Sequence, residues 1–570
     1  SIKLLELKNY IFLLFFLFGL SVFSQENYPT DYFRSPLDIP ISLAGTFGEL
    51  RSNHFHAGMD IKTKRRNGLK VYATADGYVS RIKVALWGYG KVIYIRHPNG
   101  YTSVYAHLSK FGEGIQEYVK NIQYTKESYE TGNIYPKENE IIVKKGQIIG
   151  YSGSTGGFVA PHLHYEIRDT KTEHIINPML FGLVVQDSIA PRINKLMAYP
   201  IESSSQINRT TKKQILALKK DTLNTYITNR ISAFGKIGFG INVYDRLGKE
   251  LNKNGVYSIE MLVNGKRHYY HDVETFSFAE SKYLNLLIDY PHFAKYKSRV
   301  QKTFKEKANK LSIYEDLVNE GLIDIKAGLN YQIEIIVKDF KGNTATIKIP
   351  VVGKKSEPMF KQQQDTTNYK ITKSEFHKFT QNGVTIAFPK NTFYEDVYLD
   401  FSVNEKIAKI HQPNIPLDKS YTITFDSTLY KKADLDKIYI ANINNKRYAN
   451  YQNTRKRADK VFTTTKTLGK YTLLIDKQKP KIYNPNFNKG DWLTSHKYLT
   501  IKISDSQSGI KSYEAFIDDE WILMEYDLKK KKLSYDFSDK KLVGSKHIFK
   551  LVVSDNVGNT NTYNSTFYRK

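Results

Sequence analysis

Short runs of β-branched and aromatic residues, separated by glycine-containing turns, recur along the chain from residue 37 to the end. Apolar residues at the spacing of an amphipathic helix are largely missing from the same stretch. This pattern predicts a mainly β protein built from short strands. Residues 280–325 differ, because they are rich in Lys, Glu, Ala and Leu, which favours short helices inserted between strands.

The second half of the chain contains an internal repeat. Residues 187–193 (DSIAPRI) resemble residues 476–482 (DKQKPKI). Each segment opens a stretch that ends on a similar strand-turn-strand motif, VKDFKGNTATI around Asp339 and VSDNVGNTNTY around Asp555. We interpret the repeat as two immunoglobulin-like β-sandwiches, the first interrupted by the helical insert.

A chain of 570 residues is longer than a typical domain of roughly 100 to 200 residues, so we expect several separately packed units. Residues 354–475 contain strand runs such as VTIAFP and VYLDFSV, which predict a β domain of uncertain type. The expected division is a signal peptide at 1–24, a linker at 25–36, an N-terminal β domain at 37–186, an immunoglobulin-like domain with a helical insert at 187–353, the uncertain β domain at 354–475, and a second immunoglobulin-like domain at 476–570.

The first two dozen residues have the pattern of a secretory signal. Two lysines precede an apolar run from Ile11 to Phe23, and Val22 and Ser24 stand where small residues precede cleavage. We therefore expect an exported protein of the periplasm, the cell envelope or the extracellular space. The run is shorter than the ~20 residues of a membrane-spanning helix, so we expect no transmembrane segment after cleavage, with an uncleaved anchor as the alternative.

Composition excludes several kinds of chemistry. The chain has no cysteine, which excludes a disulfide framework, a thiolate zinc site and a cysteine nucleophile. Its formal net charge of +28 favours attraction to an anionic envelope surface, although the lysines are scattered rather than gathered in a patch. Because no zinc knuckle, RNA-binding aromatic signature or basic helix is evident in the sequence, we expect no nucleic-acid partner.

Histidines are concentrated in the N-terminal domain, in the motifs NHFHAGMD, SVYAHLS and PHLHYEIR. Residues two apart on a strand project from the same face, so His162 and His164 can enter one pocket, although a lone H-x-H pair is more often a packing feature. A catalytic zinc site takes three protein ligands and leaves a fourth position for water, and His56, Asp60 and His164 would supply that set. Since the glutamate of an H-E-x-x-H helix is missing, His107 and His162 are the groups available for proton transfer.

Taken together and in this order, the motifs resemble those of the lysostaphin- and LytM-type zinc endopeptidases. The pattern of that family is H-x-x-x-D, then a histidine in an A-H-L-S context, then H-x-H. The resemblance implies that His56, Asp60 and His164 bind one zinc ion and that His107 and His162 are the catalytic histidines.

The resemblance covers roughly residues 37–185 and implies a small antiparallel β peptidase domain with an open groove for an extended peptide. The sequences VYATADGYV, GYGKVIYIRHPNG and VKKGQIIGYSGSTG also fit the family. One departure is a long segment between Leu108 and Val143, where compact members have a short connection. This insert is either a flap or wall of the groove or a decoration.

The resemblance also implies a function, which is zinc-dependent hydrolysis of stem or cross-link peptides in bacterial peptidoglycan. Peptidoglycan is then the expected partner, with envelope proteins as further partners of the β-sandwich domains. Two alternatives stay open. One is a noncatalytic envelope adaptor that activates another cell-wall hydrolase, and the other is a peptidase that acts on envelope proteins.

Overall fold

The computed structural model describes residues 28–570 apart from residues 158–159, 249–250 and 364–365. The expected signal peptide at residues 1–24 lies outside the described residues. The described chain is mainly β, as its strand-length apolar runs predict, and its α-helices are α2 (Ile115–Lys126), α3 (Leu284–Leu287) and α4 (Tyr290–Tyr296). In this part of the chain no helix is both long enough and apolar enough to cross a bilayer.

The N-terminal domain is built on an antiparallel sheet with the strand order β1, β2, β11, β6, β5, β4, β8. The strands are β1 (Leu43–Gly45), β2 (Met59–Lys62), β4 (Gly77–Val84), β5 (Lys91–Arg96), β6 (Tyr101–Ala106), β8 (Gly132–Ile134) and β11 (His162–Asp169). A smaller sheet shares the same core and consists of β3 (Lys70–Tyr72), β10 (Ile148–Tyr151) and β7 (Lys110–Phe111). Further short elements are β9 (Ile142–Val143), β12 (Ile175–Ile176) and the 3-10 helix η1 (Pro178–Phe181).

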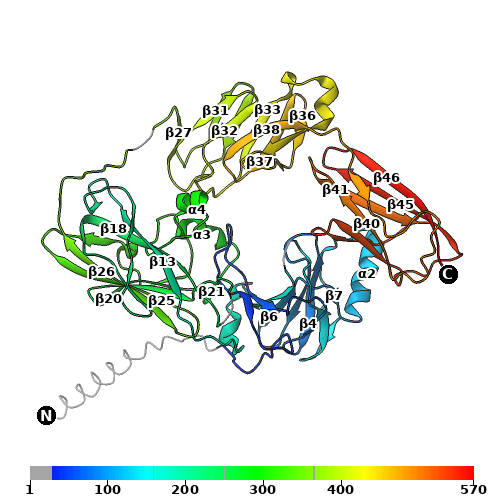
Figure 1. The fold of residues 1–570 in the computed structure, drawn as a ribbon, viewed down its shortest axis with the longest axis horizontal. Coiled ribbons are helices and arrows are strands. Elements are labelled where there is room, and N and C mark those ends of the chain that lie inside the picture. The colour runs from blue at the N-terminus through cyan, green and yellow to red at the C-terminus, as the bar shows by residue number, and fades with distance from the viewer. Residues whose placement is uncertain (1–27, 158–159, 249–250, 364–365) are drawn as a thin grey trace, which may run out of the picture.

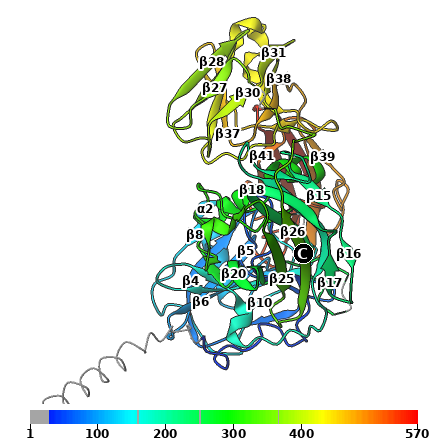
Figure 2. The same cartoon turned by 90° about the vertical axis from the view of Figure 1, so that its left-hand side faces the viewer.

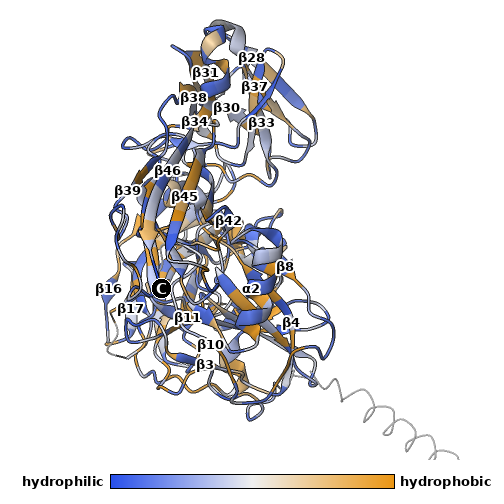
Figure 3. Ribbon diagram, turned by 90° about the vertical axis from the view of Figure 1, so that its right-hand side faces the viewer, coloured by the Kyte–Doolittle hydropathy of each residue, from blue (hydrophilic) through white to orange (hydrophobic). Residues whose placement is uncertain are grey.

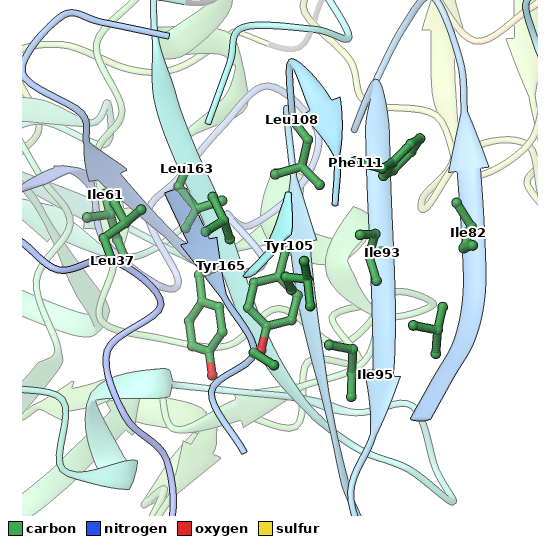
Figure 4. Close-up of a cluster of buried hydrophobic side chains, with 14 of the residues drawn as sticks. Leu37, Ile61, Ile82, Ile93, Ile95, Tyr105, Leu108, Phe111, Leu163 and Tyr165 are labelled. Carbon is green, nitrogen blue, oxygen red and sulfur yellow. The ribbon is translucent and has the colours of Figure 1, made fainter. Parts of the chain in front are cut away.

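The core of this domain fixes which residues of β11 face the site. Leu163 and Tyr165 are fully buried among apolar side chains, next to Tyr105 of β6 (Figure 4). Because side chains alternate along a strand, this packing directs the even-numbered residues of β11 to the opposite face. His162 and His164 are therefore held on one face by the burial of their neighbours.

The segment at residues 25–36, expected to be a linker, is packed where the structure describes it. Phe33 is only 6% exposed and belongs to the core of the N-terminal domain. Its ring lies 5.4 Å from that of Phe181, in an edge-to-face arrangement. Burial of this aromatic ring fixes the segment around Phe33 to the domain, and the boundary between linker and domain at residue 36 stays a prediction.

The first accessory module (residues 187–353) has its own hydrophobic core. Its strand order is β15, β13, β18, β26, β25, β19, β20, β23. The bounds are β13 (Arg192–Pro200), β15 (Gln214–Leu216), β18 (Ile231–Tyr244), β19 (Ser258–Val263), β20 (Lys266–Asp272), β23 (Tyr314–Glu315), β25 (Asn330–Lys338) and β26 (Thr344–Gly353). Short strands at its margins are β14 (Gln206–Ile207), β16 (Lys219–Lys220), β17 (Thr225–Ile227), β21 (Thr275–Phe276), β22 (Gln301–Lys302) and β24 (Ile323–Ile325).

The insert at residues 280–325 is helical only in its first part. The 3-10 turn η2 (Ser281–Tyr283) precedes α3, and α4 is followed by the strands β22, β23 and β24 and by the 3-10 turn η3 (Asn319–Gly321). Leu311 and Ile313 are buried beside Phe47 and Phe55 of the N-terminal domain. The short helices expected between strands are therefore present as α3 and α4, and in the rest of the insert these apolar contacts, together with strand pairing to β18 and β20, outweigh local helix propensity.

The second accessory module (residues 354–475) contains two larger sheets around one core. One sheet consists of β28 (His377–Gln381), β29 (Val384–Phe388), β33 (Tyr421–Asp426), β37 (Lys460–Thr465) and β36 (Arg455–Arg457). The other consists of β31 (Phe401–Asn404), β32 (Ile407–Ile410), β38 (Gly469–Ile475), β34 (Ile438–Asn442) and β35 (Asn450–Tyr451), and β27 (Tyr369–Ile371) pairs with β30 (Val397–Leu399).

The third accessory module (residues 476–570) also packs two sheets around one core. Its first sheet is β39 (Lys481–Tyr483), β40 (Tyr498–Ser504), β44 (Lys532–Asp536) and β43 (Glu525–Asp527). Its second sheet is β42 (Glu520–Trp521), β41 (Ile510–Ile517), β45 (Lys546–Asp555) and β46 (Thr560–Tyr568).

The four parts of the chain form a closed ring (Figure 1). The second accessory module stands at one end of the molecule when the ring is seen from the side (Figure 2). The third accessory module returns to the N-terminal domain, where α2 lies beside β42 (Figure 3). There the ring of Trp521 lies 5.4 Å from that of Tyr124, and Lys120 pairs with Asp539.

Candidate metal centre

Three side chains predicted as metal ligands meet at the paired strands β2 and β11 of the main sheet. Asp60 of β2 lies directly opposite His164 of β11 in the antiparallel register, and His56 precedes β2. His164 Nδ1 lies 2.9 Å from Asp60 Oδ1, and His56 Nε2 lies 3.0 Å from the same oxygen and 3.2 Å from His164 Nδ1. Zinc bonds of ~2.0–2.2 Å in a tetrahedron place ligand atoms about 3.3 Å apart, so this donor set fits zinc.

Each of the two histidines predicted as ligands is oriented by a second hydrogen bond from its other ring nitrogen. His56 Nδ1 donates to the carbonyl oxygen of Thr46 at 2.7 Å, and His164 Nε2 donates to Glu166 Oε1 at 2.9 Å. A hydrogen bond of this kind fixes the tautomer, so that the nitrogen facing the metal position carries the lone pair. The Asp60 carboxylate is held from its other oxygen by Arg51 Nη2 at 3.3 Å.

A buried ion pair that the sequence motifs did not reveal supports the site. Glu166 is fully buried, and its Oε2 lies 2.6 Å from Arg168 Nη2. Burial alone would raise the pKa of Glu166, but Arg168 and the bond from His164 lower it to about 2. The Tyr89 hydroxyl also donates to this carboxylate. The sequence does contain a sign of this pair. In HLHYEIR every second residue shares one face of the strand, and these residues are His162, His164, Glu166 and Arg168.

The two predicted catalytic histidines lie next to the ligands. The rings of His107 and His162 are 4.8 Å apart, and His162 Nε2 is 3.4 Å from Asp60 Oδ1. His107 Nδ1 donates to Thr155 O at 2.9 Å and His162 Nδ1 donates to Ala160 O at 2.7 Å. In both rings Nε2 is therefore the nitrogen that can accept a proton.

His107 is held in an unusual conformation and in its neutral form. Its backbone φ of 60° lies in the left-handed region, which is costly for a residue with a side chain. Burial, and then the neighbouring histidines His164 and His162, lower the pKa of His107 to about 3. A neutral imidazole is the form that a general base requires.

Comparison with known proteins assigns the family. Residues 54–137, which include His56, Asp60 and His107, match Peptidase family M23. This part of the chain belongs to peptidase family M23. We refer to the N-terminal domain that contains it as the M23 domain. Residues 368–476, whose type the sequence left uncertain, match a Zu5-like domain.

Curated relatives match the chain over a limited length. DD-carboxypeptidase/endopeptidase Mpg of Neisseria meningitidis serogroup B is 35% identical over 119 residues, which is 21% of this chain and 21% of the relative. Peptidoglycan DD-endopeptidase ShyC of Vibrio cholerae is 32% identical over 143 residues, which is 24% of this chain and 26% of the relative. The chain therefore spans about a quarter or less of these relatives. Among solved structures, the catalytic domain of lysostaphin from Staphylococcus simulans is 26% identical, with 24% of this chain and 88% of that one covered and a TM-score of 0.18.

A loop of the M23 domain and the third accessory module enclose a cavity beside the site. In the loop GSTGG (residues 153–157), Gly153 forms an isolated β-bridge with His162. The carbonyl oxygen of Thr155 in the same loop accepts the hydrogen bond from His107 Nδ1. A cavity of about 220 Å³ separates this loop from Glu525 and Lys532 of the accessory module. Lys91 of the M23 domain is 3% exposed and pairs with Glu525 at 2.8 Å. The accessory module thus forms part of the surroundings of the two histidines that the sequence predicts to be catalytic.

The insert between Leu108 and Val143 contributes the helix that closes the ring. Helix α2 presents Tyr124 to the third accessory module, where its hydroxyl donates to Asp539 Oδ2 at 3.2 Å. Lys540 lies over the same ring, 4.8 Å from its centroid. Part of the insert therefore docks onto another module, and its role as a flap or wall of the groove stays a prediction.

Replacement of Gly45 by alanine is expected to weaken metal binding. A Cβ at this position of β1 would lie 2.5 Å from Arg51 Nη2, 2.9 Å from Asp60 Oδ2 and 3.3 Å from a carbon of the His56 ring. Displacing groups that orient the ligands typically lowers metal affinity by about 10- to 100-fold. Zinc per chain, measured in competition with a chelator, tests this.

Gly68→Ala is the matched control for Gly45→Ala. Gly68 has a positive φ of 88°, yet an added Cβ meets no heavy atom within 4 Å. This variant is expected to strain a turn and to keep its zinc affinity. Equal zinc affinity in Gly45→Ala and the unmodified chain would contradict the ligand positions described above.

Proposed function

We propose that this chain is a zinc-dependent endopeptidase that hydrolyses peptide cross-links or stem peptides of bacterial peptidoglycan. The observation that carries the proposal is the convergence of His56, Asp60 and His164 within 3.2 Å of one another, with two further histidines beside them. Membership of residues 54–137 in peptidase family M23 and the names of the relatives Mpg and ShyC support it.

His56, Asp60 and His164 are the residues that would hold the metal. Zinc in such a site supplies Lewis-acid chemistry, which polarises a peptide carbonyl and makes water more acidic at neutral pH. Glu166 and Thr46 keep the two ligand imidazoles in the required orientation through the bonds described above.

The remaining histidines would move protons. Their unprotonated Nε2 atoms can accept a proton from the attacking water, and the resulting imidazolium can donate it to the leaving amine. The neutral form that burial gives to His107 suits the first of these roles.

Export, envelope location and the division into domains belong to the same proposal. The peptidoglycan-related names of the curated relatives support an envelope location, and the separate hydrophobic cores of the accessory modules support the boundaries at residues 186, 353 and 475. We further propose that the first and third accessory modules are immunoglobulin-like and serve to bind the wall or envelope proteins.

The decisive experiment is mass spectrometry of fragments released from purified peptidoglycan by the full chain, stripped of metal and then reloaded with zinc. We expect new peptide termini only after reloading, because the ligand set has no function without its metal. A zinc-loaded chain that releases no peptide from peptidoglycan, while the release assay works with a known endopeptidase, would contradict the proposal. Zinc binding without hydrolysis would favour the adaptor, and cleavage of envelope proteins alone would favour the other alternative.

A further inference from the structure

Three aspartates meet in the first accessory module, next to the M23 domain. Asp187 precedes β13, Asp245 follows β18 and Asp339 follows β25, so three separate loops converge at one end of the module. One carboxylate oxygen from each lies within 4.8 Å of the others. The catalytic chemistry proposed above uses none of them.

The carboxylates of this triad are not compensated within the described part of the chain. Asp245 is 2% exposed, and its Oδ1 is buried without a hydrogen-bond partner, as is Oδ2 of Asp187. Among the described residues, no Lys, Arg or His nitrogen forms an ion pair with any of the three aspartates. Burial, and then the charge of Asp187, raise the pKa of Asp245 to about 7. Buried carboxylates in native proteins are normally paired or bound to a metal.

The other oxygens of the triad are held in place by local donors. Asp187 Oδ1 accepts the backbone N–H of Ile189 at 3.1 Å. The two oxygens of Asp339 accept from the backbone and the side chain of Asn343 at 2.9 and 2.7 Å. A carboxyl group fixed in this way has little freedom to turn toward another partner. The triad is therefore a preformed arrangement of oxygen atoms around a point of unbalanced negative charge.

We propose that Asp187, Asp245 and Asp339 bind one calcium ion. All three donors are carboxylate oxygens, which suit hard cations such as Ca²⁺ or Mg²⁺ rather than zinc. The adjoining cavity has a volume of about 20 Å³, room for about one water. Mg²⁺ usually keeps several waters in a strict octahedron, whereas Ca²⁺ accepts a site made mostly of protein oxygens with irregular geometry, so calcium fits better.

The calcium site lies at the joint between two modules. Its cavity is lined by the triad and also by Thr46 and Asn177 of the M23 domain. Across the same joint, the N–H of Gly255 donates to Thr46 Oγ1 at 3.1 Å, and Thr46 O accepts the bond from His56. Bound calcium would hold in place the loops of the accessory module that contact Thr46. Thr46 is the residue that orients His56, one of the proposed zinc ligands.

The repeat places a second acidic triad, Asp476, Asp505 and Asp555, in the third accessory module. Its buried oxygens have donors, since Ser508 Oγ donates to Asp476 Oδ2 at 2.6 Å and Asn559 Nδ2 to Asp555 Oδ2 at 2.7 Å. We do not extend the proposal to this triad. Because this second triad could also hold an ion, the experiment below measures the difference in bound calcium between two proteins rather than the total.

Calcium binding to the full chain and to Asp245→Asn tests the proposal. After passage over a chelating resin, both proteins are dialysed to equilibrium with radioactive calcium at about 10 mM, above the dissociation constants of about 10⁻⁴ to 10⁻³ M that are typical of extracellular calcium modules. We expect the variant to bind one equivalent less calcium. We also expect calcium to raise the melting temperature of the first accessory module by about 3 to 8 °C in the unmodified chain only.

Two controls distinguish loss of the calcium site from a general loss of folding. In calcium-free buffer Asp245→Asn is expected to melt no lower than the unmodified chain, because it removes repulsion between buried carboxylates, whereas a loss of ordinary packing would lower its stability. Asp272→Asn is the control, since Asp272 also has a pKa raised by burial, to about 6, but lies outside the triad. It should bind calcium as the unmodified chain does. Asp339→Asn serves as the second triad variant if Asp245→Asn does not fold.

The proposal is overturned if Asp245→Asn and Asp339→Asn bind as much calcium as the unmodified chain. It is also overturned if the difference of one equivalent appears with MgCl₂ but not with CaCl₂. Because neither readout depends on hydrolysis, the result is independent of the proposed peptidase activity.

Discussion

His164→Ala is expected to lose zinc and activity together, whereas His162→Ala is expected to keep zinc and lose turnover. His164 Nδ1 lies 2.9 Å from Asp60 Oδ1 within the ligand set, so its removal leaves two protein ligands. In His162→Ala the set of His56, Asp60 and His164 remains complete. Loss of a positioned proton-transfer group typically lowers the rate by about 10² to 10⁴. Zinc quantification beside the peptide-release assay separates the two variants.

The two positions are matched controls for each other, because both are buried histidines on the same face of β11. A general disturbance of the strand would affect zinc in both variants alike. Retention of zinc in His164→Ala with its loss in His162→Ala would reverse the assignment of ligand and catalyst. Full activity in both variants would place the chemistry elsewhere.

Arg168→Met is expected to destabilise the M23 domain by about 3–5 kcal/mol, because it leaves the carboxylate of Glu166 buried without its partner. The pKa of Glu166 is held at about 2 in the folded chain, so the stabilisation is present above its ordinary value near 4.5 and is lost as the pH falls toward 2. Chemical unfolding at neutral pH therefore measures the full effect. Zinc affinity should fall as well, since Glu166 orients His164.

Arg81→Met is the control for Arg168→Met. Both arginines contact Glu173, Arg168 at 3.0 Å and Arg81 at 3.4 Å, but the Arg81 pair lies at the surface. Exposed pairs contribute about 0–1 kcal/mol, so this variant should unfold almost like the unmodified chain. Similar effects of the two substitutions would show that the buried pair has no special role.

The sequence identified the five candidate site residues because their motifs are local and ordered. H-x-x-x-D and H-x-H place two or more groups of the site within one strand or turn, where spacing alone determines which side chains can meet. Glu166 and Arg168 follow the same alternation, but a glutamate and an arginine two apart also occur on many exposed strands. Their importance depends on burial, which the sequence does not state.

Long-range contacts account for most of what the sequence could not predict. Phe33 lies in the segment predicted to be a linker, yet it is buried because Phe181 lies beside it in the fold. The docking of Tyr124 on Trp521 joins residues almost 400 positions apart, and no periodicity encodes such a pair. Asp339 was noted as part of a repeat, but only the convergence of three loops places it beside Asp187 and Asp245.

Closure of the ring makes the contact between α2 and the third accessory module intramolecular. For partners joined by a tether, the effective concentration is on the order of millimolar, so an interface too weak to hold two separate proteins can still stay closed most of the time. That advantage depends on the intervening modules presenting Trp521 to Tyr124 at the right distance, and it disappears if the geometry does not match. The stiffness of each joint, including the one at Asp187, therefore helps to determine how long Glu525 remains beside the loop that holds His107.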